Sequence, residues 1–262
     1  MVEGKSDLRK CSSVEIKDWE RVDQIGFGNL KLIQNPQEFC YGVDAVILAD
    51  FAVNFCKKAP VTVADLGCGS GIIPLIISYR TEAAHIYGVE IQKEAWDKAC
   101  RNAKLNNLEE RLTFVNADVK NAEHGWGKDL TGKMDMVTCN PPYFRKGSGI
   151  TNDSGPKAMA RHETTAGLED FLETAAVLLK RGGDMFMVHR PSRLADICFY
   201  ARKAGLEPKT MRLVSPRADE APNILLIHMV KGGGKELKVL PSWAVYDHQG
   251  RYTEDILKTY RS

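Results

Sequence analysis

Short apolar runs alternate with longer stretches of helical periodicity from residue 61 onward. The short runs predict strands at 61–66, 85–91, 112–118, 134–139 and 184–189. The longer stretches predict helices at 71–80, 93–107, 168–181 and 191–205, of which the third stops at Gly182-Gly183 and the fourth ends in Gly205. Because strands that alternate with helices form a parallel sheet with helices on both faces, the pattern predicts an α/β fold.

The two ends of the chain follow a different pattern. Two apolar runs, 210–214 and 223–230, have no helix between them, which predicts an antiparallel pair at one edge of the sheet. Near the N-terminus, the runs 29–34 and 44–55 predict a strand or hairpin and then a helix on the same sheet. We divide the chain into a charged N-terminal extension (1–25) and a single domain (26–262), in which the segment 26–60 precedes a core of 61–262.

Composition narrows the class of protein. The chain has 262 residues, 44% of them hydrophobic, which is enough for one large α/β domain. No apolar run is long enough to span a bilayer, and the charged N-terminus lacks the apolar core of a secretory signal. Seven scattered cysteines without a CxxC pair favour reduced thiols over disulfides or a structural zinc site. We therefore expect a cytoplasmic protein without metal or membrane contact. Our separate expectation for the oligomeric state, which composition does not determine, is a monomer or weak dimer.

The charge is distributed unevenly. Residues 131–262 hold 20 Lys and Arg against 15 Asp and Glu, whereas residues 1–130 hold 16 against 19. Several basic residues fall in predicted loops, which suits a polyanion such as nucleic acid. An ordinary solvated surface explains the same charges equally well.

A glycine loop follows the first core strand. DLGCGSGI (65–72) contains Gly67, Gly69 and Gly71 in a GxGxG spacing, which differs from the dinucleotide fingerprint and from a P-loop. Glu90 closes the second core strand, where a carboxylate can accept hydrogen bonds from ribose hydroxyls. Asp118 closes the third, where it can accept from an adenine amino group. Either acid alone can instead cap the helix that follows it. Together the three features predict a cofactor that contains adenosine.

These residues resemble those of class I S-adenosylmethionine-dependent methyltransferases. The resemblance implies a Rossmann-like, seven-stranded, mostly parallel sheet with helices on both faces and an antiparallel edge strand. It implies S-adenosylmethionine as cofactor and S-adenosylhomocysteine as product. It also implies that Asp65 helps to place the methionine part, and that the segment 41–51, with Tyr41 and Asp44, closes over it. Asp44 equally suits the first turn of a helix.

The strand 134–139 ends in NPPYF (140–144). Pro141 and Pro142 have no N–H, so the loop offers the Asn140 side chain and bare carbonyl oxygens as acceptors. We predict that Asn140, at the cofactor's edge of the sheet, and Pro141 accept the two N–H groups of a planar –NH2. This draws the nitrogen toward tetrahedral geometry and frees its lone pair for in-line attack on the sulfonium methyl group. Tyr143 and Phe144 stack on the flat group that carries the amine.

The wider sequence is similar to one family, the bacterial tRNA1(Val) (adenine-37-N6)-methyltransferases. The resemblance rests on GFGNLKLIQNPQEFCYGVDAVILADF, DLGCGSGIIPLII, NPPYF, ARHE (160–163) and VYDHQGRYTEDI (245–256). It implies tRNA as partner and an adenine N6 as acceptor. The long loop after NPPY holds basic residues that can contact RNA phosphates, and a histidine that can stack on a base or start a helix. These residues are Arg145, Lys146, Lys157, Arg161 and His162.

Other functions fit part of the pattern. NPPY also serves acceptors such as cytosine N4, guanine N2 and the glutamine side chain. A glutamine methyltransferase that acts on release factors usually has a helical N-terminal domain, for which residues 1–60 look too short. An rRNA guanine-N2 methyltransferase is a closer alternative, although such chains are commonly longer. A non-catalytic RNA-binding protein would be expected to have lost some of the site residues, and an NAD dehydrogenase requires a different glycine spacing.

Overall fold

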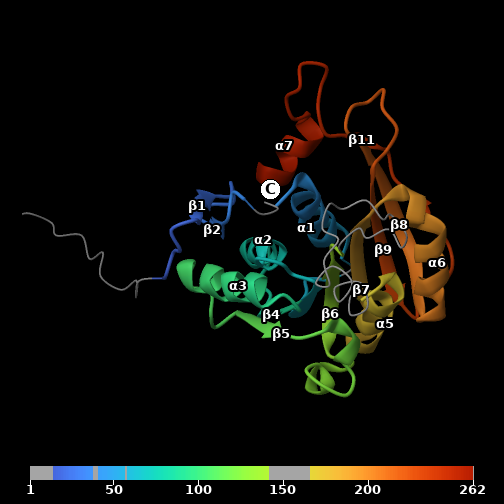
Figure 1. Ribbon diagram of the computed structural model, residues 1–262. Helices are drawn as coiled ribbons and strands as arrows, with labels where there is room; N and C mark the ends of the chain where they lie inside the picture. The colour runs from blue at the N-terminus through green and yellow to red at the C-terminus, as the bar shows by residue number, and fades with distance from the viewer. Residues whose placement is uncertain (1–13, 38–40, 57, 142–165, 262) are drawn as a thin grey trace, which may run out of the picture.

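The computed structural model describes residues 14–37, 41–56, 58–141 and 166–261. Within these residues the main sheet has nine strands in the order β10-β8-β9-β7-β6-β3-β4-β5, with β11 also pairing β8 (Figure 1). The strands are β3 (Thr62–Leu66), β4 (His85–Glu90), β5 (Leu112–Asn116), β6 (Met134–Cys139), β7 (Leu179–His189), β8 (Leu206–Ser215), β9 (Ile224–Lys231), β10 (Lys238–Val239) and β11 (Trp243–Ala244). Only β9 runs against its neighbours in the described sheet, so the sheet is mostly parallel.

Helices cover both faces of this sheet. They are α1 (Val43–Phe55), α2 (Ile72–Arg80), α3 (Lys93–Leu105), α5 (Leu168–Leu178), α6 (Leu194–Lys203) and α7 (Glu254–Arg261), with 3-10 turns η1 (Val119–Asn121), η2 (Lys128–Leu130) and η3 (Pro191–Arg193). Strand residues alternate between the faces. On β6, Met136 packs with α1 and α2, whereas Val137 packs with α5 and α6. The two apolar cores therefore lie on opposite sides of one sheet (Figure 1).

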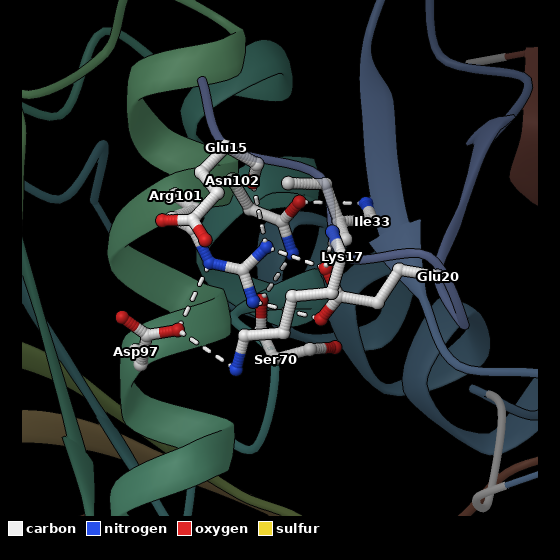
Figure 2. Close-up of polar contacts among 8 residues, drawn as sticks. All are labelled: Glu15, Lys17, Glu20, Ile33, Ser70, Asp97, Arg101 and Asn102. Atoms are coloured by element: carbon white, nitrogen blue, oxygen red, sulfur yellow. Dashed lines mark hydrogen bonds and ion pairs between the residues drawn. The ribbon is translucent and has the colours of Figure 1, made fainter.

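The N-terminal residues form a separate hairpin. Strand β1 (Arg21–Gln24) pairs antiparallel with β2 (Lys31–Gln34). Arg101 of α3 fastens the segment before the hairpin, because its guanidinium donates to the Glu20 carboxylate at 2.6 and 2.7 Å and to the Glu15 carbonyl at 2.9 Å (Figure 2). The predicted boundary between the N-terminal extension (1–25) and the domain (26–262) stays a prediction. Strand β1 lies before this boundary and β2 after it, and the two strands pair with each other.

The predicted α/β fold is confirmed, with two refinements. The terminal pair β8 and β9 is antiparallel as expected, but β9 lies between β7 and β8, so the parallel strand β8 is the outer one. The two-residue strands β10 and β11 both add to β8, which makes nine described strands rather than seven.

The prediction of a helix at 168–181 was wrong at its C-terminal end. Helix α5 ends at Leu178, and Leu179 already pairs with Met134 of β6. The apolar residues of α5 continue into the strand without a break, so periodicity could not locate the change. Gly182-Gly183 lies within β7 at a register shift and does not stop the helix.

The ring of Phe114 on β5 depends on a neighbouring glycine. A Cβ atom at Gly88 of β4 would lie 2.4 Å from Phe114 Cδ1 and 2.8 Å from Cys68 Sγ. We predict that Gly88→Ala lowers the free energy of unfolding by about 1–3 kcal/mol through overpacking, measured by urea denaturation. Gly234→Ala is the control, because no atom of the described residues lies within 4 Å of its added Cβ. Equal urea midpoints for the two variants would contradict this packing.

Candidate active site

The carboxyl ends of three strands meet at one edge of the sheet. Strand β3 lies between β4 and β6 and pairs with both in parallel, with Leu66 opposite Val89 and Cys139. The glycine loop after β3, Glu90 at the end of β4 and Asn140 after β6 are therefore neighbours, as the sequence predicted. This edge is where parallel α/β sheets bind ligands.

The three glycines of the loop have positive φ angles, a conformation that other residues adopt only with strain. Gly67, Gly69 and Gly71 have φ of 72°, 54° and 84°. The N–H groups of Gly67 and Cys68 both donate to the Val89 carbonyl, at 2.9 and 3.0 Å. A Cβ at Gly69 would meet no described atom within 4 Å, so among the described residues the loop borders open space at this point.

Glu90 holds this loop against β4. The residue is 6% exposed. Its Oε2 accepts the Gly69 N–H at 2.9 Å, and its Oε1 accepts the Gln92 N–H at 2.8 Å. Each carboxylate oxygen has two lone pairs, so the same group can also accept hydrogen bonds from two hydroxyls of a ligand.

Asp65 is fully buried beside this loop. Its Oδ1 accepts a hydrogen bond from Thr138 Oγ1 at 2.7 Å, while Oδ2 finds no donor within the described residues. Burial, with a smaller contribution from the Glu90 charge, raises the Asp65 pKa to about 7, against the opposing effect of the Thr138 hydrogen bond. A buried acceptor without a donor fits a ligand that brings one.

Asp118 caps a short turn. Its Oδ1 accepts the Lys120 N–H at 3.0 Å at the start of η1, and its carbonyl accepts from Trp126 Nε1. The capping role considered from the sequence is therefore present. Its second carboxylate oxygen lies 3.5 Å from Lys120 Nζ, and the role toward adenine stays a prediction.

The remaining predicted residues fall into two groups. Tyr41 donates its N–H to Gln34 Oε1 at 3.2 Å, and the Asp44 carboxylate lies beside Gly42 at the start of α1. Asn140 is half-buried and Pro141 is buried. A second group lies outside the described residues and comprises Pro142, Tyr143, Phe144, Arg145, Lys146, Lys157, Arg161 and His162.

Asn102 contacts the site but was missed from the sequence. It is fully buried on α3; its Oδ1 accepts the Ile33 N–H at 2.7 Å, and its Nδ2 donates to the Ser70 carbonyl at 2.9 Å (Figure 2). One side-chain amide thus joins the glycine loop to β2. The available signal was a polar residue between Ala99 and Ala103 on the apolar side of a helix.

The described part of the chain lacks two features, a membrane-spanning helix and a metal-binding cluster. No helix there is long and apolar enough to cross a membrane. Residues 14–37, 41–56, 58–141 and 166–261 contain no group of three or more His, Cys, Asp or Glu side chains placed to hold a metal ion.

Comparison with known proteins agrees with this architecture. The profile of the methyltransferase small domain family matches residues 45–195. A tRNA1(Val) (adenine(37)-N6)-methyltransferase from Porphyromonas gingivalis is 30% identical over 202 residues, which are 76% of this chain and 74% of the relative. Among solved structures, a predicted O-methyltransferase from Agrobacterium tumefaciens has a TM-score of 0.65 and 22% identity, over 83% of this chain and 95% of that one. The structure of TYW2 from M. jannaschii in complex with AdoMet has a TM-score of 0.54 and 14% identity. The match covers 82% of this chain and 86% of that one.

The sheet order and the glycine loop define a class I S-adenosylmethionine-dependent methyltransferase fold. Within that class, the chain belongs to the methyltransferase small domain family and, in it, to the tRNA1(Val) (adenine(37)-N6)-methyltransferase family. The predicted fold class and family are thus confirmed, and S-adenosylmethionine is the cofactor that both imply.

The Asp65 carboxyl makes stability depend on pH. Its folded pKa of about 7 lies above the value of about 3.9 for an unfolded chain, so the native state binds the extra proton and stability falls as pH rises between these values. In wild type, the free energy of unfolding is expected to fall by up to about 4 kcal/mol over this pH range because of Asp65, and we predict that Asp65→Asn abolishes this contribution. The free energy of unfolding of the cofactor-free protein, measured from about pH 4 to pH 8, tests this. The exposed Asp219→Asn is the control, and parallel curves for Asp65→Asn and wild type would contradict the assignment.

Asn102 is expected to position the cofactor loop. We predict that Asn102→Ala weakens S-adenosylmethionine binding about tenfold, because the Ser70 carbonyl loses its buried donor. Asn106→Ala is a matched control. The Asn106 side chain also bonds β2, because it accepts from the Lys31 N–H and donates to the Lys31 carbonyl, but among the described residues it does not bond the glycine loop. Titration calorimetry gives the affinity and thermal unfolding the stability. A purely structural role would lower the Tm of both variants and leave both affinities unchanged.

Proposed function

We propose that this protein transfers a methyl group from S-adenosylmethionine to the exocyclic N6 of an adenine in tRNA, at position 37 of a valine tRNA. The observation that carries the proposal is the placement of Asn140 and Pro141 at the edge where the glycine loop and Glu90 lie. The family and the name of its Porphyromonas gingivalis member support the choice of acceptor.

The residues present fit the cofactor. Within the described residues, the open space at Gly69 and the Asp65 Oδ2 without a donor leave room and hydrogen-bonding capacity for a ligand. In the proposal Gly67, Gly69 and Gly71 line the cofactor, Glu90 accepts from the ribose hydroxyls and Asp118 from the adenine amino group. Asp65 faces the methionine part, whose ammonium group would favour the ionised carboxylate. Tyr41 and Asp44 close the site from the start of α1.

The cofactor supplies an activated methyl group on a sulfonium. Asn140 Oδ1 and the Pro141 carbonyl accept the two N–H groups of the adenine amine, which orients its lone pair toward the methyl carbon. As the C–N bond forms and the S–C bond breaks, these two acceptors stabilise the charge that develops on the nitrogen. The amine then loses one proton to solvent. Tyr143 and Phe144 stack on the base in this proposal, and Arg145, Lys146, Arg161 and His162 contact the RNA.

The proposal includes the surroundings of the reaction. The partner is tRNA in the cytoplasm, the protein acts as a monomer or weak dimer, and the transfer proceeds without a metal ion. Positioning and electrostatics alone suffice because the methyl group arrives already activated.

Replacement of Asn140 tests the chemistry. We predict that Asn140→Ala binds S-adenosylmethionine with wild-type affinity but transfers methyl groups about 100-fold more slowly or worse, because one acceptor for the developing charge is lost. The assay is labelled-methyl transfer to total tRNA from a strain that lacks the enzyme, followed by nucleoside analysis. Full activity of the variant would contradict the mechanism.

The same assay, run with total tRNA and, in parallel, with rRNA and total protein from that strain, tests the substrate. N6-methyladenosine in valine tRNA is the expected product. N2-methylguanosine in rRNA, or methylglutamine in a protein, would overturn the proposed acceptor.

A further inference from the structure

A small hairpin near the C-terminus is held rigidly at the surface. Within residues 245–253, here called the tyrosine hairpin, Tyr246 and Tyr252 form an antiparallel bridge. Asp247 organises the turn, because its Oδ1 accepts the N–H groups of Gln249 and Arg251 at 2.8 and 3.0 Å. Its Oδ2 accepts from the Arg251 side chain at 3.0 Å. These contacts fix a loop whose tip is exposed to solvent.

The hairpin carries the outer end of a stack of aromatic rings. The ring of Tyr246 stacks on Tyr252 with centroids 5.4 Å apart, and Tyr252 stacks on Tyr260 at 6.1 Å. Tyr260 in turn stacks on Phe27 at 5.7 Å. Phe27 is 1% exposed, whereas Tyr246 is 38% exposed. The stack thus begins in the core, and within the described residues Tyr246 is its last ring.

The tyrosine hairpin rises from the same edge of the sheet as the proposed active site. Strand β11, which leads into it, pairs in parallel with the end of β8, with Ala244 opposite Ser215. The Tyr246 N–H donates to the Pro216 carbonyl just beyond β8. Strands β6, β7, β9, β8 and β11 are successive neighbours (Figure 1). Asn140 directly follows β6 in the chain. Four strand spacings separate the two places, which is about 19 Å.

Among the described residues, three arginines near the tyrosine hairpin are each paired with an acid. Arg193 and Arg217 follow β7 and β8, and each pairs with a nearby acid, Asp196 at 2.7 Å and Glu220 at 3.1 Å. Arg251 is likewise paired with Asp247. Because these three arginines are already paired, they would gain little from neutralising RNA phosphates. An exposed aromatic ring offers a different source of affinity, since every nucleobase has a face that can stack on it.

We propose that the tyrosine hairpin binds unpaired nucleotides of the RNA substrate, with one base stacked on Tyr246. The proposal rests on the proposed function, because an adenine that reaches Asn140 must be splayed from its loop and leaves neighbouring bases unstacked. At the rise of about 3.4 Å per nucleotide of a stacked strand, about 19 Å corresponds to roughly five or six nucleotides, and unstacked nucleotides span it in fewer. The ligand is single-stranded RNA next to the target base, and the contribution of Tyr246 is stacking.

The test compares three variants at Tyr246. The probe is a fluorescein-labelled stem-loop RNA with the unmodified anticodon arm of valine tRNA, and the readout is its Kd by fluorescence anisotropy. Tyr246→Ala weakens binding about 5- to 100-fold, Tyr246→Phe binds like wild type, and Tyr246→Leu, which keeps apolar cover on Tyr252, resembles the alanine variant. Phe199→Ala is the matched control, since Phe199 is 65% exposed on α6.

Further readouts separate stacking from folding and from charge. The affinity of Tyr246→Ala for S-adenosylmethionine and its transfer rate at saturating RNA stay at wild-type values. The slope of log Kd against log salt is also unchanged, because no phosphate contact is lost. The variant loses affinity for the stem-loop but not for a blunt duplex of the same stem.

Two outcomes overturn the inference separately from the proposed function. If wild-type protein methylates valine tRNA and Tyr246→Ala binds the stem-loop like Tyr246→Phe, the tyrosine hairpin does not bind RNA bases. A fall in Tm with no change in RNA affinity leads to the same conclusion. If wild-type protein neither binds the stem-loop nor methylates tRNA, the proposed function itself fails.

Discussion

The glycine loop keeps its shape because the buried Glu90 carboxylate accepts the N–H groups of both Gly69 and Gln92. This one side chain joins the turn after β3 to the turn after β4, so the backbone that faces a ligand is fixed before the ligand arrives. Its negative charge also contributes to the raised pKa of Asp65. The two acids are therefore coupled: Glu90 accepts hydrogen bonds in a preformed site, while Asp65 remains easily protonated until a cationic group approaches.

The same loop is connected to the N-terminal part of the chain. Asn102 bonds the Ser70 carbonyl and the Ile33 N–H, and the adjacent Arg101 fastens Glu20 (Figure 2). Both residues lie in the C-terminal half of α3, so this part of the helix contacts the cofactor loop as well as the β1–β2 hairpin and the segment before it. Displacement of the hairpin would therefore disturb a buried amide next to the glycine loop.

The sequence predicted elements and site residues correctly where the signal lies in neighbouring residues. It failed where the structure depends on pairing between residues that are distant in sequence. The apolar run 134–139 is bounded by polar residues and a proline, and β6 has those bounds. The glycine loop and Glu90 were found because φ-positive glycines and strand-end acids leave local signals. The start of β7 was missed because Leu178 and Leu179 look alike, and only pairing with Met134 separates helix from strand. Asn102 was missed because its role depends on two backbone groups that are distant in sequence. The position of β9 between β7 and β8 was missed because it depends on pairing between strands that are far apart in sequence.

Recognition of a planar –NH2 by two acceptors leaves the identity of its carrier undetermined, since adenine, cytosine and glutamine present the same two donors. Discrimination must then come from contacts farther from the amine. The region matched by the family profile, 45–195, contains the glycine loop and Asn140 but not the two ends of the chain. Those ends meet where Phe27, from the β1–β2 turn, stacks on Tyr260 of α7, and the same stack continues to Tyr246. Described residues from both ends of the chain are thus packed on each other, and in our proposal this shared surface holds the RNA beside the active-site edge.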